Sequence, residues 1–156
     1  ALTSNKISLY ALIACHVVII CYTPFQKGDF CPMNIIELLG LKTTLISAEK
    51  TIVSVSVSDK LMQPYGIVHG GVNALLAETA ASLGAKATLP PEYIPVGVDI
   101  QTHHLKAVSA GHLIATAEPI NIGHSIQVWS VTIHEQTANI VTSFSTVTIK
   151  CQKNNK

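Results

Sequence analysis

The chain has 156 residues, of which 48% are hydrophobic and 12% charged, with a formal net charge of +1. This length suffices for the core of one domain, and the charged fraction is about half of the usual share, which favours extensive burial or a subunit interface. The near-neutral charge and the 5% of aromatic residues argue against nucleic-acid binding. The four cysteines form no Cys-x-x-Cys pair, so we expect reduced thiols in a cytoplasmic protein, without a zinc site or a disulfide framework.

Residues 1–32 differ in character from the rest of the chain. Their apolar run at 7–22 follows a lysine and is short for a membrane span, which needs about 20 residues. Three interpretations are open: a hydrophobic segment that packs on the domain, a targeting or membrane-associating segment, or upstream sequence included by a misplaced start. We favour the third, because Met33 opens a stretch that reads as a natural first helix. The division is then an extension (1–32), one domain (33–151) and a polar tail (152–156).

The pattern of the remaining chain predicts a short helix, a strand and a long helix. Asn34 can cap a helix that ends at Gly40. The run at 43–58 is rich in β-branched residues, and its valines alternate with serines, which predicts one half-buried strand. A loop at 59–68, marked by proline and glycine, precedes a helix at about 70–87.

Strand-like patterns fill most of the last third of the chain. Short separators containing glycine or asparagine divide them into four runs, near 95–107, 112–121, 125–135 and 139–150. A helix, a strand, a long helix and four strands together predict an antiparallel sheet with one buried helix, an α+β fold.

The beginning of the long helix carries the clearest chemical signal. Gly70 and Gly71 let backbone N–H groups approach a ligand closely, and the first turn of a helix suits an oxygen that gains negative charge. Further along, Glu78 is the only charged residue between His69 and Lys86. A glutamate in a helix is usually a solvated surface residue, but a helix that is apolar on every side is normally buried. We therefore expect a buried, functional carboxylate, and the pair of features indicates acyl transfer or hydrolysis.

The spacing of these residues resembles a known family. A glutamine lies six residues before His69, a glutamate nine after it and a serine four beyond that, and the likeness continues downstream through 96–106, 110–112, 123–125 and 127–129. This pattern, covering about 34–150, resembles the hotdog-fold acyl-CoA thioesterases, most closely the branch that acts on aromatic acyl thioesters such as hydroxybenzoyl-CoA and dihydroxynaphthoyl-CoA. The resemblance implies a sheet wrapped around a long central helix.

The resemblance also implies roles for five residues near the long helix. The N–H of Gly70 would stabilise the oxyanion, and Glu78 would act as nucleophile or as general base towards water, a choice that the sequence leaves open. Ser82, one helical turn beyond Glu78, would hold the water or orient the carboxylate, unless it is a small residue that eases packing. Gln63 and His69 would polarise the carbonyl or orient the substrate, unless Gln63 only bonds loop backbone.

Substrate binding is expected to involve a second group of residues. His103 and His104 occupy one predicted strand, so they point to opposite faces. The resemblance favours His104, which matches the family's second histidine, as the one that faces the helix. Coenzyme A carries phosphates, for which Lys106 and the turn made of Gly123, His124 and Ser125 are candidates. Many members of the family that the chain resembles carry arginine where His124 stands, so the resemblance predicts a weaker or pH-dependent phosphate contact here. Ligand-spaced histidines or cysteines are missing, so we expect no metal and no cofactor beyond the coenzyme A of the substrate.

The favoured function is hydrolysis of an acyl-CoA or acyl-carrier-protein thioester, with an aromatic acyl group preferred. The resemblance implies a homodimer or homotetramer, with Glu78 of one protomer facing the Gly70 loop of the other. Two alternatives stay open, because one fold hosts several activities. A hotdog dehydratase or hydratase would carry a His-Phe-Pro or Asp-x-Asn-x-x-His set, which is missing here. A non-catalytic acyl-CoA binder would not need a carboxylate beside the thioester.

Overall fold

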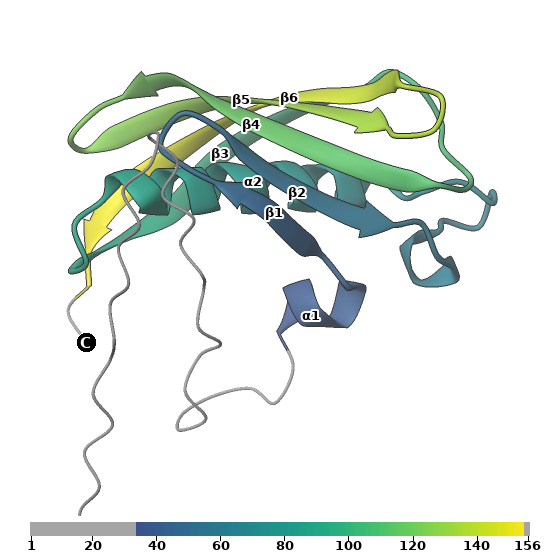
Figure 1. Cartoon of the computed structure of the whole chain (residues 1–156), viewed down its shortest axis with the longest axis horizontal. Coiled ribbons are helices and arrows are strands. Elements are labelled where there is room, and N and C mark those ends of the chain that lie inside the picture. Colours follow the sequence, from purple (N-terminus) through teal and green to yellow (C-terminus); the bar gives the residue numbers. More distant parts are fainter. Residues whose placement is uncertain (1–33, 155–156) are drawn as a thin grey trace, which may run out of the picture.

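A computed structural model describes residues 34–154 and shows one antiparallel sheet packed on one long helix (Figure 1). The elements are α1 (Ile35–Leu39), β1 (Lys42–Ile46), β2 (Thr51–Ser56), the 3₁₀ turn η1 (Asp59–Leu61), α2 (Gly70–Thr88), β3 (Tyr93–His104), β4 (His112–Ile122), β5 (Ile126–Glu135) and β6 (Ile140–Lys153). The strand order is β1-β2-β4-β5-β6-β3, with every neighbouring pair antiparallel. This confirms the predicted α+β class; the prediction for residues 1–32 concerns residues outside the described range.

The helix α2 is covered by the sheet on one side only (Figure 1). Its buried residues recur three or four positions apart and form one face: Val72, Asn73, Leu76, Ala77, Ala80, Ala81, Gly84 and Ala85. Glu78 lies on the opposite face and is exposed in the single chain. The expectation of a carboxylate buried by its own chain is therefore wrong, because the apolar residues beside Glu78 line an open groove instead of the core. Within residues 34–154, no helix is both long and apolar enough to cross a membrane.

A tryptophan of β5 fixes the C-terminal half of α2 on the sheet. Trp129 is fully buried, and a Cβ added to Gly84 would lie 2.7 Å from two atoms of its ring, so only glycine lets helix and ring pack this closely. The indole Nε1 donates to Gln127 Oε1 (3.1 Å), and Gln127 Nε2 donates to Thr88 Oγ1 (2.7 Å). This buried chain of hydrogen bonds ties the last residue of α2 to β5.

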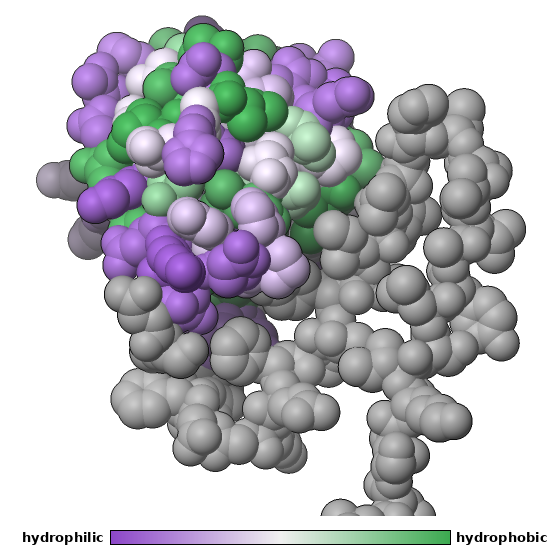
Figure 2. Space-filling model, turned by 90° about the vertical axis from the view of Figure 1, so that its left-hand side faces the viewer, coloured by the Kyte–Doolittle hydropathy of each residue, from purple (hydrophilic) through white to green (hydrophobic). Residues whose placement is uncertain are grey.

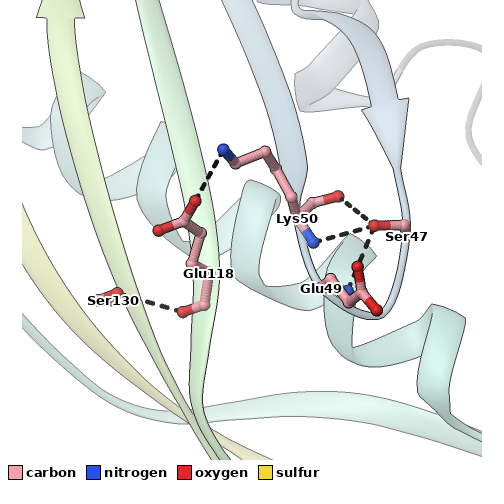
Figure 3. A network of polar contacts seen from close by, with 5 residues as sticks. All are labelled: Ser47, Glu49, Lys50, Glu118 and Ser130. Carbon is pink, nitrogen blue, oxygen red and sulfur yellow. Dashed lines mark hydrogen bonds and ion pairs between the residues drawn. The ribbon is translucent and has the colours of Figure 1, made fainter.

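The single strand predicted at 43–58 is in fact the hairpin β1–β2. Ser47 forms the turn, because its hydroxyl accepts from Lys50 N (3.0 Å) and donates to Lys50 O (2.9 Å) (Figure 3). Lys50 Nζ then pairs with Glu118 Oε1 of β4 at 2.8 Å. The β-branched pattern concealed this turn, since a serine hydroxyl that bonds nearby backbone can interrupt a strand without glycine or proline.

The β5–β6 turn is held by one carboxylate. Glu135 accepts hydrogen bonds from Ala138 N (2.7 Å), Thr137 N (3.0 Å) and His112 N (3.4 Å). The N–H of Ala138 first, then that of Thr137, lowers the pKa of Glu135 from 4.5 to about 2. A carboxyl group whose pKa is depressed in the folded state stabilises the fold at pH values above its unfolded pKa.

We therefore expect acid to weaken this turn through Glu135. Its contribution should be complete above pH about 4.5 and should be lost as the pH falls towards about 2. Urea unfolding of wild type and Glu135→Gln, measured on both sides of this window, checks the expectation. The wild type should lose its advantage over the variant in acid; a difference that is independent of pH would contradict it.

Candidate active site

The N-terminus of α2 presents one free backbone donor. His69 is the N-cap, and its Nδ1 accepts from Gly71 N at 2.9 Å. The N–H of Val72 donates to His69 O (2.9 Å), and His69 N donates to Leu61 O (2.8 Å). The N–H of Gly70 donates to no other residue in the described part of the chain. Of the first helical N–H groups, it is thus the one available to an incoming oxygen, and its role as oxyanion donor stays a prediction.

The loop before α2 is closed by the backbone of Gln63. Its N–H donates to Ile67 O (2.9 Å), and its carbonyl accepts from Gly66 N (3.0 Å), where Gly66 has a φ of 73°. The loop ends pair as the bridge Met62–Val68. The side-chain amide of Gln63 bonds no other residue among 34–154, so the alternative in which it serves only to bond the loop backbone is not supported.

His104, at the end of β3, packs directly on the start of α2. A Cβ added to Gly70 would lie 2.8 Å from His104 Nε2, so the ring occupies the space that any other side chain would need. On the other side of the ring, His104 Nδ1 lies 3.3 Å from Nδ2 of Asn73. His104 is therefore the member of the histidine pair that faces the helix, as expected. Asn73 was not among the predicted site residues; its signal is a polar side chain within the buried stripe of α2.

Glu78 reaches from the uncovered face of α2 to the edge strand β3. A Cβ added to Gly97 would overlap Oε1 of Glu78, so the carboxylate lies against the bare backbone of this glycine. The register of β3 against β6 shifts between Gly97 and Asp99, which marks a bulge. Gly97 belongs to the stretch 96–106 that resembles the family, but its contact with Glu78 cannot be inferred from the sequence.

A groove of about 450 Å³ runs along this face of α2. Glu78 and Ser82 both line it, which confirms that they share one face of the helix. Its remaining walls are mostly apolar and come from α1, α2 and the start of β3; they include Ile36, Leu75, Leu83, Ile94 and Pro95. The groove thus offers a carboxylate and a hydroxyl beside an apolar surface.

The residues predicted to supply the oxyanion donor and the catalytic carboxylate lie far apart along the helix of one chain. Gly70 and Glu78 are separated by eight residues of helix, which is about 12 Å along the axis at 1.5 Å per residue. Reacting atoms must approach to about 3–3.5 Å. In the structure the Glu78 carboxylate lies against Gly97, whereas His104, seven residues further along the same strand, lies against Gly70.

The expected contacts for coenzyme A also separate in the single chain. Lys106 is exposed and follows β3 near the start of α2, with its N–H donating to Thr142 O at 3.1 Å. The turn 123–125 lies at the opposite end (Figure 1), where Gly123 and His124 line a second, smaller cavity beside the last turn of α2. Figure 2 views the molecule from this end and shows hydrophobic residues among hydrophilic ones. The two groups lie towards opposite ends of α2, whose 19 residues span about 28 Å.

Comparison with known proteins identifies the family. The family model described as thioesterase superfamily matches residues 65–142. The 1,4-dihydroxy-2-naphthoyl-CoA hydrolase of Listeria monocytogenes is 39% identical over 124 residues, covering 80% of this chain and all of the relative. The chain belongs to the thioesterase superfamily. The 1,4-dihydroxy-2-naphthoyl-CoA thioesterase 2 of Arabidopsis thaliana is 32% identical to this thioesterase over 133 residues, covering 81% of it and 84% of the relative.

A solved structure agrees with the family assignment. The crystal structure of a thioesterase from Haemophilus influenzae matches this thioesterase with a TM-score of 0.75 and 32% sequence identity, covering 81% of this chain and 87% of the other. The predicted hotdog fold and the predicted thioesterase activity are thereby confirmed.

Proposed function

We propose that this thioesterase hydrolyses aromatic acyl thioesters of coenzyme A or of an acyl carrier protein, in a site shared by two protomers. The observation that carries the proposal is the pair formed by the free N–H of Gly70 and the uncovered carboxylate of Glu78, whose residues lie about 12 Å apart along the axis of α2 in one chain. The Listeria and Arabidopsis relatives, named for a naphthoyl-CoA substrate, support the aromatic acyl group.

A two-fold symmetric dimer brings the separated groups together. The strand β3 is the last in the sheet order, and its outer edge has no partner strand among residues 34–154. If two copies pair through this edge about a two-fold axis, their α2 helices run antiparallel. The Gly70 end of one helix then lies beside the Glu78 groove of the other, and Lys106 of one protomer approaches the turn 123–125 of the other. This contact is compatible with a homodimer and with a homotetramer built from two such dimers.

In this shared site the thioester carbonyl oxygen would accept from Gly70 N–H. Because His69 Nδ1 is occupied by Gly71 N–H, a neutral His69 ring carries its proton on Nε2 and can donate from there to the substrate. The free amide of Gln63 is a further donor beside the same oxygen. Together these groups stabilise the negative charge that develops on the oxygen in the tetrahedral transition state.

Glu78 of the other protomer would complete the reaction in one of two ways. As a general base it takes a proton from water, whose oxygen bonds to the carbonyl carbon while the carbon–sulfur bond breaks and the thiolate leaves. As a nucleophile its carboxylate oxygen bonds to that carbon, the carbon–sulfur bond breaks and the thiolate leaves; water then hydrolyses the resulting mixed anhydride to the free acid and the Glu78 carboxylate. Ser82 lines the same groove, where its hydroxyl can hold the water or orient the carboxylate.

Release of free thiol from a panel of acyl thioesters tests the proposal. The panel should contain hydroxybenzoyl-CoA, hydroxynaphthoyl-CoA, short and medium aliphatic acyl-CoAs, and one aromatic acyl-carrier-protein. We expect kcat/KM for the aromatic group to exceed that for the aliphatic group by at least about tenfold, as differential contacts in an apolar pocket allow. A preference for aliphatic chains would refute the aromatic assignment. No release from any thioester would instead favour a hydratase or a binding protein.

A further inference from the structure

A buried asparagine stands behind one of the residues at the proposed site. Asn73 is 8% exposed and lies in the face of α2 that packs on the sheet, among alanine, valine and leucine. Its Nδ2 lies 3.3 Å from His104 Nδ1. Its Oδ1 has no hydrogen-bond partner among residues 34–154. Burying a polar group without its hydrogen-bond partners costs free energy of folding, so the presence of this amide in an apolar stripe calls for a functional explanation.

The direction of this hydrogen bond follows from the two possible amide orientations. With Nδ2 towards the ring, one amide N–H is paired, while the other N–H and the oxygen have no partner among residues 34–154. Turned by 180°, the amide would pair its oxygen but leave both N–H groups buried and unpaired, and buried unpaired N–H groups are rarer in proteins than buried unpaired carbonyl oxygens. The amide of Asn73 therefore donates, and Nδ1 of His104 accepts.

This direction determines which nitrogen of His104 carries the proton. A ring whose Nδ1 accepts a hydrogen bond has its proton on Nε2 when neutral. That Nε2 lies over Gly70, beside the free backbone N–H. The two donors are thus neighbours at the start of α2, and the ring cannot turn without losing the bond to Asn73.

We propose that Asn73 is a positioning residue, which fixes the orientation and the Nε2–H tautomer of His104 so that this ring donates to the thioester oxygen together with Gly70. The inference rests on the proposed function for the identity of the oxygen. The tautomer itself rests only on the contact between Asn73 and His104 and can be measured without turnover.

Nitrogen-15 NMR of the histidine rings in the full-length protein tests the tautomer directly. His104→Gln identifies the His104 signals by their disappearance, and His103→Gln is the matched control from the other face of β3. We expect His104 in the wild type to be protonated on Nε2 with a bare Nδ1. In Asn73→Asp, whose carboxylate can only accept, a proton should appear on Nδ1. A wild-type His104 protonated on Nδ1 would overturn the inference, whether or not the protein hydrolyses thioesters.

Kinetics then separate positioning from a merely structural role. Asn73→Leu, which is similar in size but cannot donate, should lower kcat by about tenfold, as expected for a displaced catalytic group, with little change in KM. In a His104→Gln background, Asn73→Leu should lower kcat no further, because Asn73 acts through the His104 ring. If Asn73→Leu lowers kcat equally in both backgrounds, or only lowers the unfolding temperature, Asn73 is structural. The wild-type NMR result stands even if a variant fails to fold.

Discussion

Replacing Glu78 by glutamine should lower kcat by about 10²–10⁴-fold, the range by which a positioned acid–base group accelerates a reaction. The amide keeps the shape of the side chain but can neither take a proton from water nor attack a carbonyl. Glu78 is exposed on the uncovered face of α2, so the change should leave the unfolding temperature within the small range typical of surface substitutions. Thiol release by wild type and variant, with circular dichroism to check folding, measures both quantities.

Ser82→Ala is the matched control for this prediction. Ser82 lines the same groove one helical turn away, and its hydroxyl is proposed only to assist. Its loss should therefore lower kcat by much less than the loss of the carboxylate. Equal activity of Glu78→Gln and wild type would remove Glu78 from the mechanism and with it the hydrolytic site proposed here.

Mixing Glu78→Gln with a second inactive variant tests whether the site is shared by two protomers. Gly70→Pro removes the proposed oxyanion N–H, and the backbone accepts proline, because Gly70 is the first residue of α2 and follows an extended His69 with ψ of 135°. The new Cβ, 2.8 Å from His104 Nε2, also displaces that ring, so both changes disable the same half of the proposed site. Each variant alone should be inactive. Equal amounts of the two, allowed to exchange subunits, should recover about a quarter of the wild-type activity, since half of the dimers then hold one intact site. No recovery from mixed dimers, or full activity in a sedimenting monomer, would contradict the shared site.

Local sequence signals predicted most of the fold. The cap at Asn34, the left-handed Gly40 and the long run from Gly70 each lie where the sequence placed them, because these signals act within a few residues. The turn at Ser47 was missed because a serine can form it inside a β-branched run. The exposure of Glu78 was missed for a different reason. The sequence of an apolar helix face is the same whether the sheet of its own chain or a second protomer covers that face.

The site was predictable in its parts but not in its contacts. Glycines, a lone carboxylate and histidines at recognisable spacing indicated the chemistry, and the free N–H of Gly70 agrees with it. The contact of His104 with Asn73 joins residues 31 positions apart, and that of Glu78 with Gly97 joins a helix to an edge strand. Such pairs depend on the packing of α2 against β3, which no local pattern encodes.

The second large effect is expected at Gly97, where alanine should lower kcat while leaving the fold stable. An added Cβ would overlap Oε1 of Glu78, and the atom that must move is the far end of a flexible, exposed side chain. Alanine in a strand is otherwise no worse than glycine. The displaced carboxylate should cost about 10²-fold in kcat, the size expected when a reacting group moves by about 1 Å.

Two measurements tie this loss to Glu78. In a Glu78→Gln background, Gly97→Ala should cause little further loss of kcat, because the group that it displaces no longer takes part. The unfolding temperature of Gly97→Ala should equal or exceed that of wild type, since removing a strand glycine reduces the entropy lost on folding. The unfolding temperature would then stay equal or rise while kcat falls. This result would show that Gly97 leaves space for the Glu78 carboxylate and is not needed for the stability of β3. A variant that loses stability and activity in parallel would instead assign Gly97 to the bulge of β3 alone.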